Sequence, residues 1–199
     1  MNLFTKLITL LSVPLMVINL LGGVVSFIWL AVLGEWSIIG YGIAGLVVST
    51  FCIGLAMMPG LLLAVPSVAL YEKGNKFGFY VFSFLSTLYT VAVLCVWCLG
   101  VLFFFTKLAD SSSFIPVLLW SYGVATAPIA SMAQKEQNEY AFISTFFAQI
   151  SYIAVMLIVI FSRTSLLDVS IVFGIIMSVG LIIQFAIANQ IEKEEQQGW

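Results

Sequence analysis

Long apolar stretches separated by short polar segments make up most of this chain. At about 1.5 Å per residue, a helix of roughly 20 residues crosses the ~30 Å hydrocarbon core of a bilayer. Every Asp, Glu, Lys and Arg stands between the apolar stretches or near a chain end. The pattern predicts an all-α integral membrane bundle of about six transmembrane helices with short loops, forming a single domain. We place these helices at residues 7–33, 37–58, 78–105, 114–132, 140–161 and 168–189, with a polar tail at 191–199.

The second apolar stretch, Ser37 to Leu70, is too long for a straight span. As one helix it would measure roughly 50 Å. Proline removes a backbone donor and crowds the preceding helical turn, so we expect a kinked or re-entrant extension over residues 59–70. Pro59 and Gly60 are hinge candidates here, and Pro128 is one in the fourth helix. The very short turn before this stretch predicts that the first two helices are antiparallel neighbours.

Small residues recur along the second helix at spacings of three and four. This spacing puts them on one face, where the backbone of a neighbouring helix can approach closely, and such packing drives helix association in lipid. We therefore expect the second helix at the centre of the bundle. A glycine-hinged moving gate is the alternative use of the same residues. The predicted packing seam consists of Gly42, Gly45, Ser49, Cys52 and Ala56.

Composition and charge narrow the classes of function. The chain is 62% hydrophobic and 8% charged, against roughly 25% charged in soluble domains, so membrane lipids are its surroundings. A net charge of −2 gives no basic face for nucleic acid. Proton relays, haem ligation and metal-dependent hydrolysis need ionisable or ligating side chains within the membrane. The predicted helices carry none apart from cysteine, so we expect no cofactor, no metal site and no enzymatic activity.

Three amide side chains fall inside the predicted helices, away from the helix ends. An unpaired amide in hydrocarbon costs a few kcal/mol, so each needs a partner. Counted along the helices, all three can share the cytoplasmic half of the membrane. The plainer interpretation is a set of interhelical hydrogen bonds, and the sharper one is a neutral polar pocket opening inward. The residues of this predicted polar cluster are Asn19, Gln149 and Gln184.

Cys95 and Cys98 form a C-x-x-C motif inside the third helix. Such pairs support thiol–disulfide exchange when a thiolate is accessible. The helix places both sulfurs deep in hydrocarbon, and the only other cysteine, Cys52, lies at a different depth. Buried cysteine acts as a small hydrophobe, which favours packing over redox chemistry.

The distribution of basic residues predicts the orientation. With both termini in the cytoplasm, five of the seven Lys and Arg fall inside, as the positive-inside rule favours. We expect a multi-pass protein of the plasma (inner) membrane. The residues on the inner side would be Lys6, Lys73, Lys76, Lys135 and Lys193, with Lys107 and Arg163 outside.

Three functional hypotheses follow, in order of preference. The first is a non-enzymatic structural or scaffold subunit whose seams hold partner helices or further copies of the chain. The second is a carrier or binding component for a neutral or lipidic small molecule, with the proline irregularities as hinges. The third is a membrane thiol oxidoreductase that uses Cys95 and Cys98.

Overall fold

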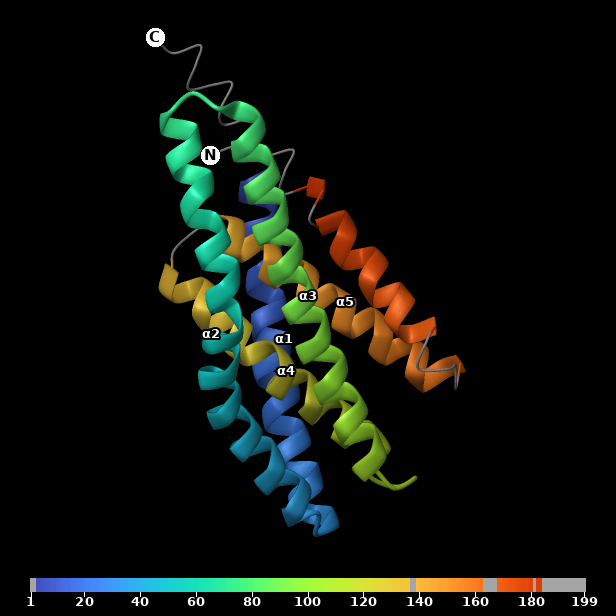
Figure 1. Cartoon of the computed structure of the whole chain (residues 1–199). Coiled ribbons are helices and arrows are strands. Elements are labelled where there is room, and N and C mark those ends of the chain that lie inside the picture. Colours follow the sequence, from blue (N-terminus) through green and yellow to red (C-terminus); the bar gives the residue numbers. More distant parts are fainter. Residues whose placement is uncertain (1–2, 137–138, 163–167, 181, 184–199) are drawn as a thin grey trace.

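The computed structural model describes residues 3–136, 139–162, 168–180 and 182–183, and these form helices joined by short turns (Figure 1). No strand occurs in these ranges, so the all-α prediction is confirmed for the described part of the chain. The helices are α1 (Leu3–Leu33), α2 (Trp36–Glu72), α3 (Lys76–Leu108), α4 (Phe114–Glu136) and α5 (Glu139–Ser162), followed by a further helix, Asp168–Gly180.

Helix length and composition identify a membrane protein. In the described part, four helices are long and apolar enough to cross a membrane. α5 and the last helix contribute shorter apolar stretches, Thr145–Phe161 and Asp168–Gly180. Large apolar side chains are exposed along α1, α2 and α3, as expected of surfaces that face lipid. The four candidate spans are Leu10–Leu33, Trp36–Tyr71, Lys76–Leu108 and Phe114–Ser131.

The fourth helix, and not the second, occupies the centre of the bundle. Of the apolar 18-residue stretch of α4, 61% is buried, against 18% of the corresponding stretch of α2. α4 packs against α1, α2, α3 and α5, whereas α2 packs chiefly against α3. The expectation that α2 is central was therefore wrong. Small-residue spacing shows where a helix can be approached closely, but it does not give the number of neighbours that approach it.

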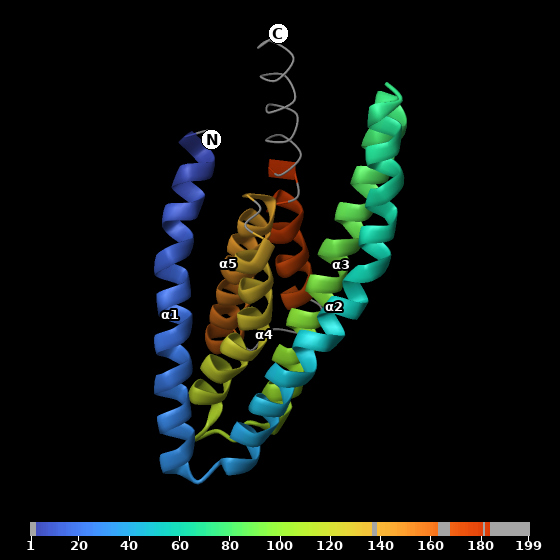
Figure 2. The same ribbon diagram turned by 90° about the vertical axis from the view of Figure 1, so that its left-hand side faces the viewer.

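α1 and α2 are joined by a tight turn in which Gly34 has a φ of 79°, a left-handed conformation that glycine adopts without strain. The two helices are antiparallel, as the short turn predicted. They are neighbours only near the turn, however, because the α2–α3 hairpin leans away from α1 (Figure 2). Helices α4 and α5 and the helix Asp168–Gly180 lie between them in this view.

α2 is one continuous helix of 37 residues with Pro59 and Pro66 inside it. Residues 59–70 therefore extend the second helix and do not form a re-entrant segment. At about 1.5 Å per residue α2 is about 55 Å long, well above the hydrocarbon thickness, so it must tilt, curve or extend beyond the bilayer core. Figure 2 shows it curving along its length.

The small-residue face of α2 is packed within the chain, against two different helices. A Cβ on Gly42 would fall 1.9 Å from the Trp120 indole nitrogen of α4, and one on Gly60 would fall 3.1 Å from the Tyr89 ring of α3. Ser49 is fully buried and Ala56 half-buried, but Cys52 is exposed. At 3.6 residues per turn, the step from Ser49 falls between 52 and 53, and Ile53 takes the buried position.

Two hydrogen bonds join α2 and α3 around the Pro59–Gly60 step. The Ser86 hydroxyl donates to the Gly60 carbonyl at 2.8 Å, and the Tyr89 hydroxyl donates to the Ala56 carbonyl at 3.0 Å. Beyond this point the hairpin is a two-helix arm, since no described residue of α3 before Leu94 is buried. The buried core therefore lies in the other half of the molecule, around α4.

Candidate functional site

Hydrogen-bonding side chains gather around the middle of α4. Ala125, halfway along this helix, lies about 17 Å from its start, which is near the middle of a ~30 Å hydrocarbon layer. The residues concerned come from α1, α4 and α5, and all but the first are buried. We call them the interior polar cluster: Asn19, Ser121, Tyr122, Thr126, Gln149 and Tyr152.

Helical spacing accounts for the gathering. Gln149 and Tyr152 are three residues apart on α5, so they lie on the same face of that helix. Tyr122 and Thr126 are four apart on α4 and likewise share a face. α4 and α5 pack against each other, and the rings of Tyr122 and Tyr152 lie 5.6 Å apart between their centroids. The two polar faces are therefore opposed.

One part of the cluster is fully hydrogen-bonded. The Tyr152 hydroxyl donates to the Ser121 hydroxyl oxygen at 2.8 Å, and Ser121 in turn donates to the Leu118 carbonyl at 2.7 Å. Tyr152 and Ser121 are both buried. This chain of neutral groups ties α5 to α4.

A second hydrogen-bonded chain ties α1 to α4. The Asn19 amide nitrogen donates to the Thr126 hydroxyl oxygen, and the Thr126 hydroxyl donates to the Tyr122 carbonyl at 2.7 Å. Gly123 lies next to this contact, and a Cβ there would be in ordinary van der Waals contact, 3.6 Å, with the Asn19 amide oxygen.

The remaining polar atoms of the cluster are buried without partners. Both amide atoms of Gln149 and the Tyr122 hydroxyl have no hydrogen-bond partner, and Gln149 is 1% exposed and Tyr122 2% exposed. Leaving one buried polar group unpaired costs about 1–3 kcal/mol, so such atoms call for an explanation, and an internal water or a ligand provides one. The Trp120 indole N–H is also unpaired, but it faces the backbone of Gly42.

The three predicted amides differ in their hydrogen bonding. Asn19 is hydrogen-bonded to α4 and Gln149 has no partner, while Gln184 lies outside the described residues. Sequence reasoning missed the hydroxyl partners of these amides on α4 and the tyrosine pair. Their signal was weak, because Ser, Thr and Tyr are common on membrane helices and only the packing reveals which of them turn inward.

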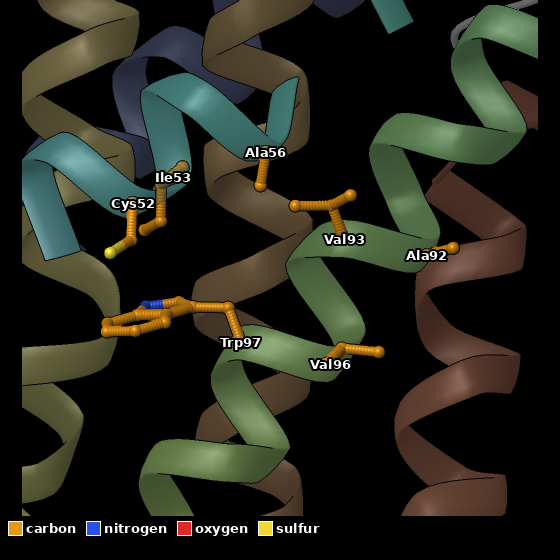
Figure 3. A pocket seen from close by; sticks show the side chains of 7 residues that line it. All are labelled: Cys52, Ile53, Ala56, Ala92, Val93, Val96 and Trp97. Atoms are coloured by element: carbon orange, nitrogen blue, oxygen red, sulfur yellow. The ribbon is translucent and has the colours of Figure 1, made fainter. Parts of the chain in front are cut away.

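An open apolar groove of about 320 Å³ lies between α2 and α3 (Figure 3). The Trp97 indole extends from α3 toward Cys52 and Ile53 of α2, and Val93 is directed toward Ala56. The groove opens to the surface, since Cys52 is exposed and Val96 is 74% exposed. We call it the lateral groove; its lining residues are Cys52, Ile53, Ala56, Ala92, Val93, Val96 and Trp97.

Trp97 forms the wall between the lateral groove and α4. Its indole N–H donates to the Ala125 carbonyl at 3.0 Å. Ala125 is one helical turn from Tyr122 and adjacent to Thr126 in the chain. The next residue, Cys98, is fully buried in the same core as Tyr152.

The three cysteines differ in exposure. Cys98 is fully buried, Cys95 is half-buried and Cys52 is exposed on α2, and all three are free thiols. Cys52, the most exposed of the three, is not part of the C-x-x-C motif. Within the described residues, no group of three or more His, Cys, Asp or Glu side chains is placed to hold a metal ion.

Comparison of the chain with protein-family models, curated proteins and solved structures finds no match. The class of protein is therefore assigned from the fold and the candidate site alone. In its described part the molecule is an all-α membrane protein with an uncharged polar interior and an apolar groove between α2 and α3 that opens to the surface.

Proposed function

We propose that the protein is a non-enzymatic carrier or binding component for a neutral or lipidic small molecule within the membrane. The observation that carries the proposal is the buried amide of Gln149, which has no hydrogen-bond partner; the Tyr122 hydroxyl of α4, the helix against which α5 packs, is likewise unpaired. A polar group at this depth is costly and persists where it has a use. A bound molecule that donates and accepts hydrogen bonds would offset that cost.

The chemistry of the interior restricts the ligand to neutral molecules. None of the buried residues of the described bundle carries a formal charge, so nothing would compensate a buried ion. The unpaired interior groups that remain are the Gln149 amide and the Tyr122 hydroxyl, which suit a hydroxyl, an amide or a similar neutral head. The lateral groove between α2 and α3 is apolar and suits a hydrocarbon portion.

The scaffold hypothesis receives less support from the packing. It drew on small-residue seams left open for partner helices. In α2 that face is filled within the chain, with Gly42 and Gly45 against α4 and Gly60 against α3. The seam therefore gives no argument for a partner helix, and the carrier becomes the preferred proposal. Pro59 and Pro128, inside continuous helices, remain the hinge candidates for the motion that a carrier needs.

The proposal includes six spans, cytoplasmic termini and location in the plasma (inner) membrane. The start of α1 and the α2–α3 turn lie at the same end of the molecule in Figure 2. This is consistent with Lys6, Lys73 and Lys76 facing one compartment. Labelling of single cysteines introduced at Lys73 and at Lys107 with a membrane-impermeant maleimide tests the orientation. Labelling of Lys73→Cys from outside intact cells would overturn it.

Thermal unfolding of the purified protein in lipid nanodiscs tests the carrier proposal. A panel of neutral amphipathic molecules and their charged analogues would be added at increasing concentration. A ligand at 100 times its Kd adds about 2.7 kcal/mol of stability, so at least one neutral compound should raise the unfolding temperature. Complete indifference to the panel would contradict the proposal.

A matched measurement addresses the scaffold alternative. Chemical cross-linking in native membranes, followed by purification in mild detergent, reports whether the chain is recovered alone or with a constant partner. Recovery in a stoichiometric complex, together with no response to the ligand panel, would favour the scaffold. A ligand-responsive monomer would favour the carrier.

A further inference from the structure

Both helices of the α2–α3 hairpin leave the hydrophobic core at the same level. Met57 is the last residue of α2 that packs against the core, and Val91 is the first residue of α3 that does so. None of the described residues from 58 to 90 belongs to the core or packs against it. The outer part of the hairpin, residues 61–85, leans away from α1 in Figure 2, and we call it the hairpin arm.

α2 has a weak point at the level where it leaves the core. Pro59 has no backbone N–H, so the carbonyl of Leu55, four residues earlier, loses its helical donor, and the proline ring crowds that turn. Sharp bends in helices are found at such positions. Pro66 has the same chemistry, but it lies inside the hairpin arm, where α2 has already left the core.

α3 has a matching weak point beside it. The hydroxyls of Thr87 and Thr90 donate to carbonyls four residues earlier in the same helix, those of Ser83 and Ser86, at 2.8 and 3.0 Å. Hydrogen bonds of this kind slightly destabilise a helix and often bend it. The chain therefore has, at one level, a proline in one helix and two such threonines in the other.

The two weak points are bonded to each other. Ser86 donates to the Gly60 carbonyl at 2.8 Å, and Tyr89 donates to the Ala56 carbonyl at 3.0 Å. The helices also approach closely here, since a Cβ on Gly60 would lie 3.1 Å from the Tyr89 ring and 3.7 Å from the backbone oxygen of Ser86. A bend of α2 at this level therefore carries α3 with it.

We propose that the hairpin arm swings as one body about a hinge formed by Pro59–Gly60 of α2 and Ser86–Thr90 of α3. A hinge in α2 alone would be blocked, because α3 runs beside it and is bonded to it. The arm extends about 20 Å from Gly60 to its tip at Lys73. A bend of about 20° therefore moves the tip by about 7 Å. This inference goes beyond the proposed carrier function, since the hinge belongs to the ligand-free protein.

Distances between pairs of spin labels test the hinge in the full-length protein, reconstituted in lipid nanodiscs without ligand. The labels are attached to p-acetylphenylalanine, so the native cysteines stay in place. The tip pair joins Lys73 to Leu10, an exposed position of α1 two residues after the buried Ile8. The control pair joins Val32 and Lys107, near the core ends of α1 and α3. The distance distribution of the tip pair should be about 7 Å wider than that of the control pair, for a bend of about 20°.

Two proline variants form a matched pair. Pro59→Ala restores the missing backbone donor and removes the ring, so it should narrow the distribution of the tip pair to the width of the control pair. Pro66→Ala makes the same chemical change inside the hairpin arm and should leave that width unchanged.

A third pair of labels tests whether the arm moves as one body. It joins Val65 of α2 to Val81 of α3, both exposed and both within the arm. Its distribution should be narrow in the unmodified protein. In the double variant Ser86→Ala and Tyr89→Phe, which loses both hydrogen bonds between the helices, it should become wider because the helices then move separately.

The outcomes are distinguishable from those for the carrier. A tip pair no wider than the control pair would overturn the inference, and so would equal effects of the two proline variants. An arm pair that is wide in the unmodified protein, or narrow in the double variant, would also overturn it. A swinging arm in a protein that responds to no ligand of the panel would support the hinge and contradict the carrier. Ligand stabilisation with a narrow tip pair would do the reverse.

Discussion

Replacing Gln149 with leucine should stabilise the ligand-free protein, although most substitutions at a fully buried site destabilise. The amide oxygen and nitrogen are both buried without a partner, and each unpaired group costs about 1–3 kcal/mol. Leucine has a similar volume and no polar atom, so it should fill the same space without that cost. Hydrogen-bond effects inside membrane proteins are often below 1 kcal/mol. We therefore expect a gain of about 1–2 kcal/mol in the free energy of unfolding.

The measurement is reversible unfolding in mixed micelles, without added ligand, for the unmodified protein and Gln149→Leu. Two tyrosine variants provide a matched pair on opposed helices. Tyr122→Phe removes an unpaired hydroxyl and should be neutral or stabilising. Tyr152→Phe removes a hydroxyl bonded to Ser121 at 2.8 Å and should cost about 0.5–1.5 kcal/mol.

A loss of 1 kcal/mol or more in Gln149→Leu would refute the reasoning. It would mean that the amide is paired in the ligand-free protein, for example with an internal water, and that this pairing stabilises the fold. The expected gain, accompanied by loss of the ligand response, would instead be the usual trade between stability and function at a binding site.

Three further predictions concern packing and access. Gly42→Ala should lower the free energy of unfolding by about 1–3 kcal/mol, because the new methyl group would overlap a buried indole of α4. Gly40→Ala, where a Cβ would have nothing within 4 Å, should be neutral or gain up to about 1 kcal/mol from helix propensity. Equal melting of the two variants would contradict the packing of α2 on α4. Trp97→Phe should cost about 0.5–1.5 kcal/mol in unfolding experiments, since it removes the 3.0 Å bond between α3 and α4, and an unchanged stability would mean that this bond is replaced by water. In native vesicles a membrane-permeant maleimide should modify Cys98 only after denaturation, because its side chain is fully buried; rapid modification of Cys98 would revive the redox hypothesis.

The sequence was sufficient for the class of protein and for the approximate positions of the helices. Helix formation in lipid depends on local properties, namely an apolar run of adequate length with every backbone group bonded within the helix. The segments predicted at residues 78–105 and 114–132 thus lie inside α3 and α4 as observed. The face carrying Gly42 and Ser49 also follows from spacing alone, because 3.6 residues per turn is a property of one helix.

Which helix is central, and which polar atoms have partners, was decided by the tertiary structure. Cys52 and Ile53 are adjacent in sequence, yet only Ile53 is buried, because the direction of approach of α3 selects between them. Asn19 and Gln149 are both amides in apolar helices, yet Asn19 finds Thr126 and Gln149 finds no partner. A hydrogen bond between helices depends on their relative rotation and depth, which the pattern along a single helix does not contain.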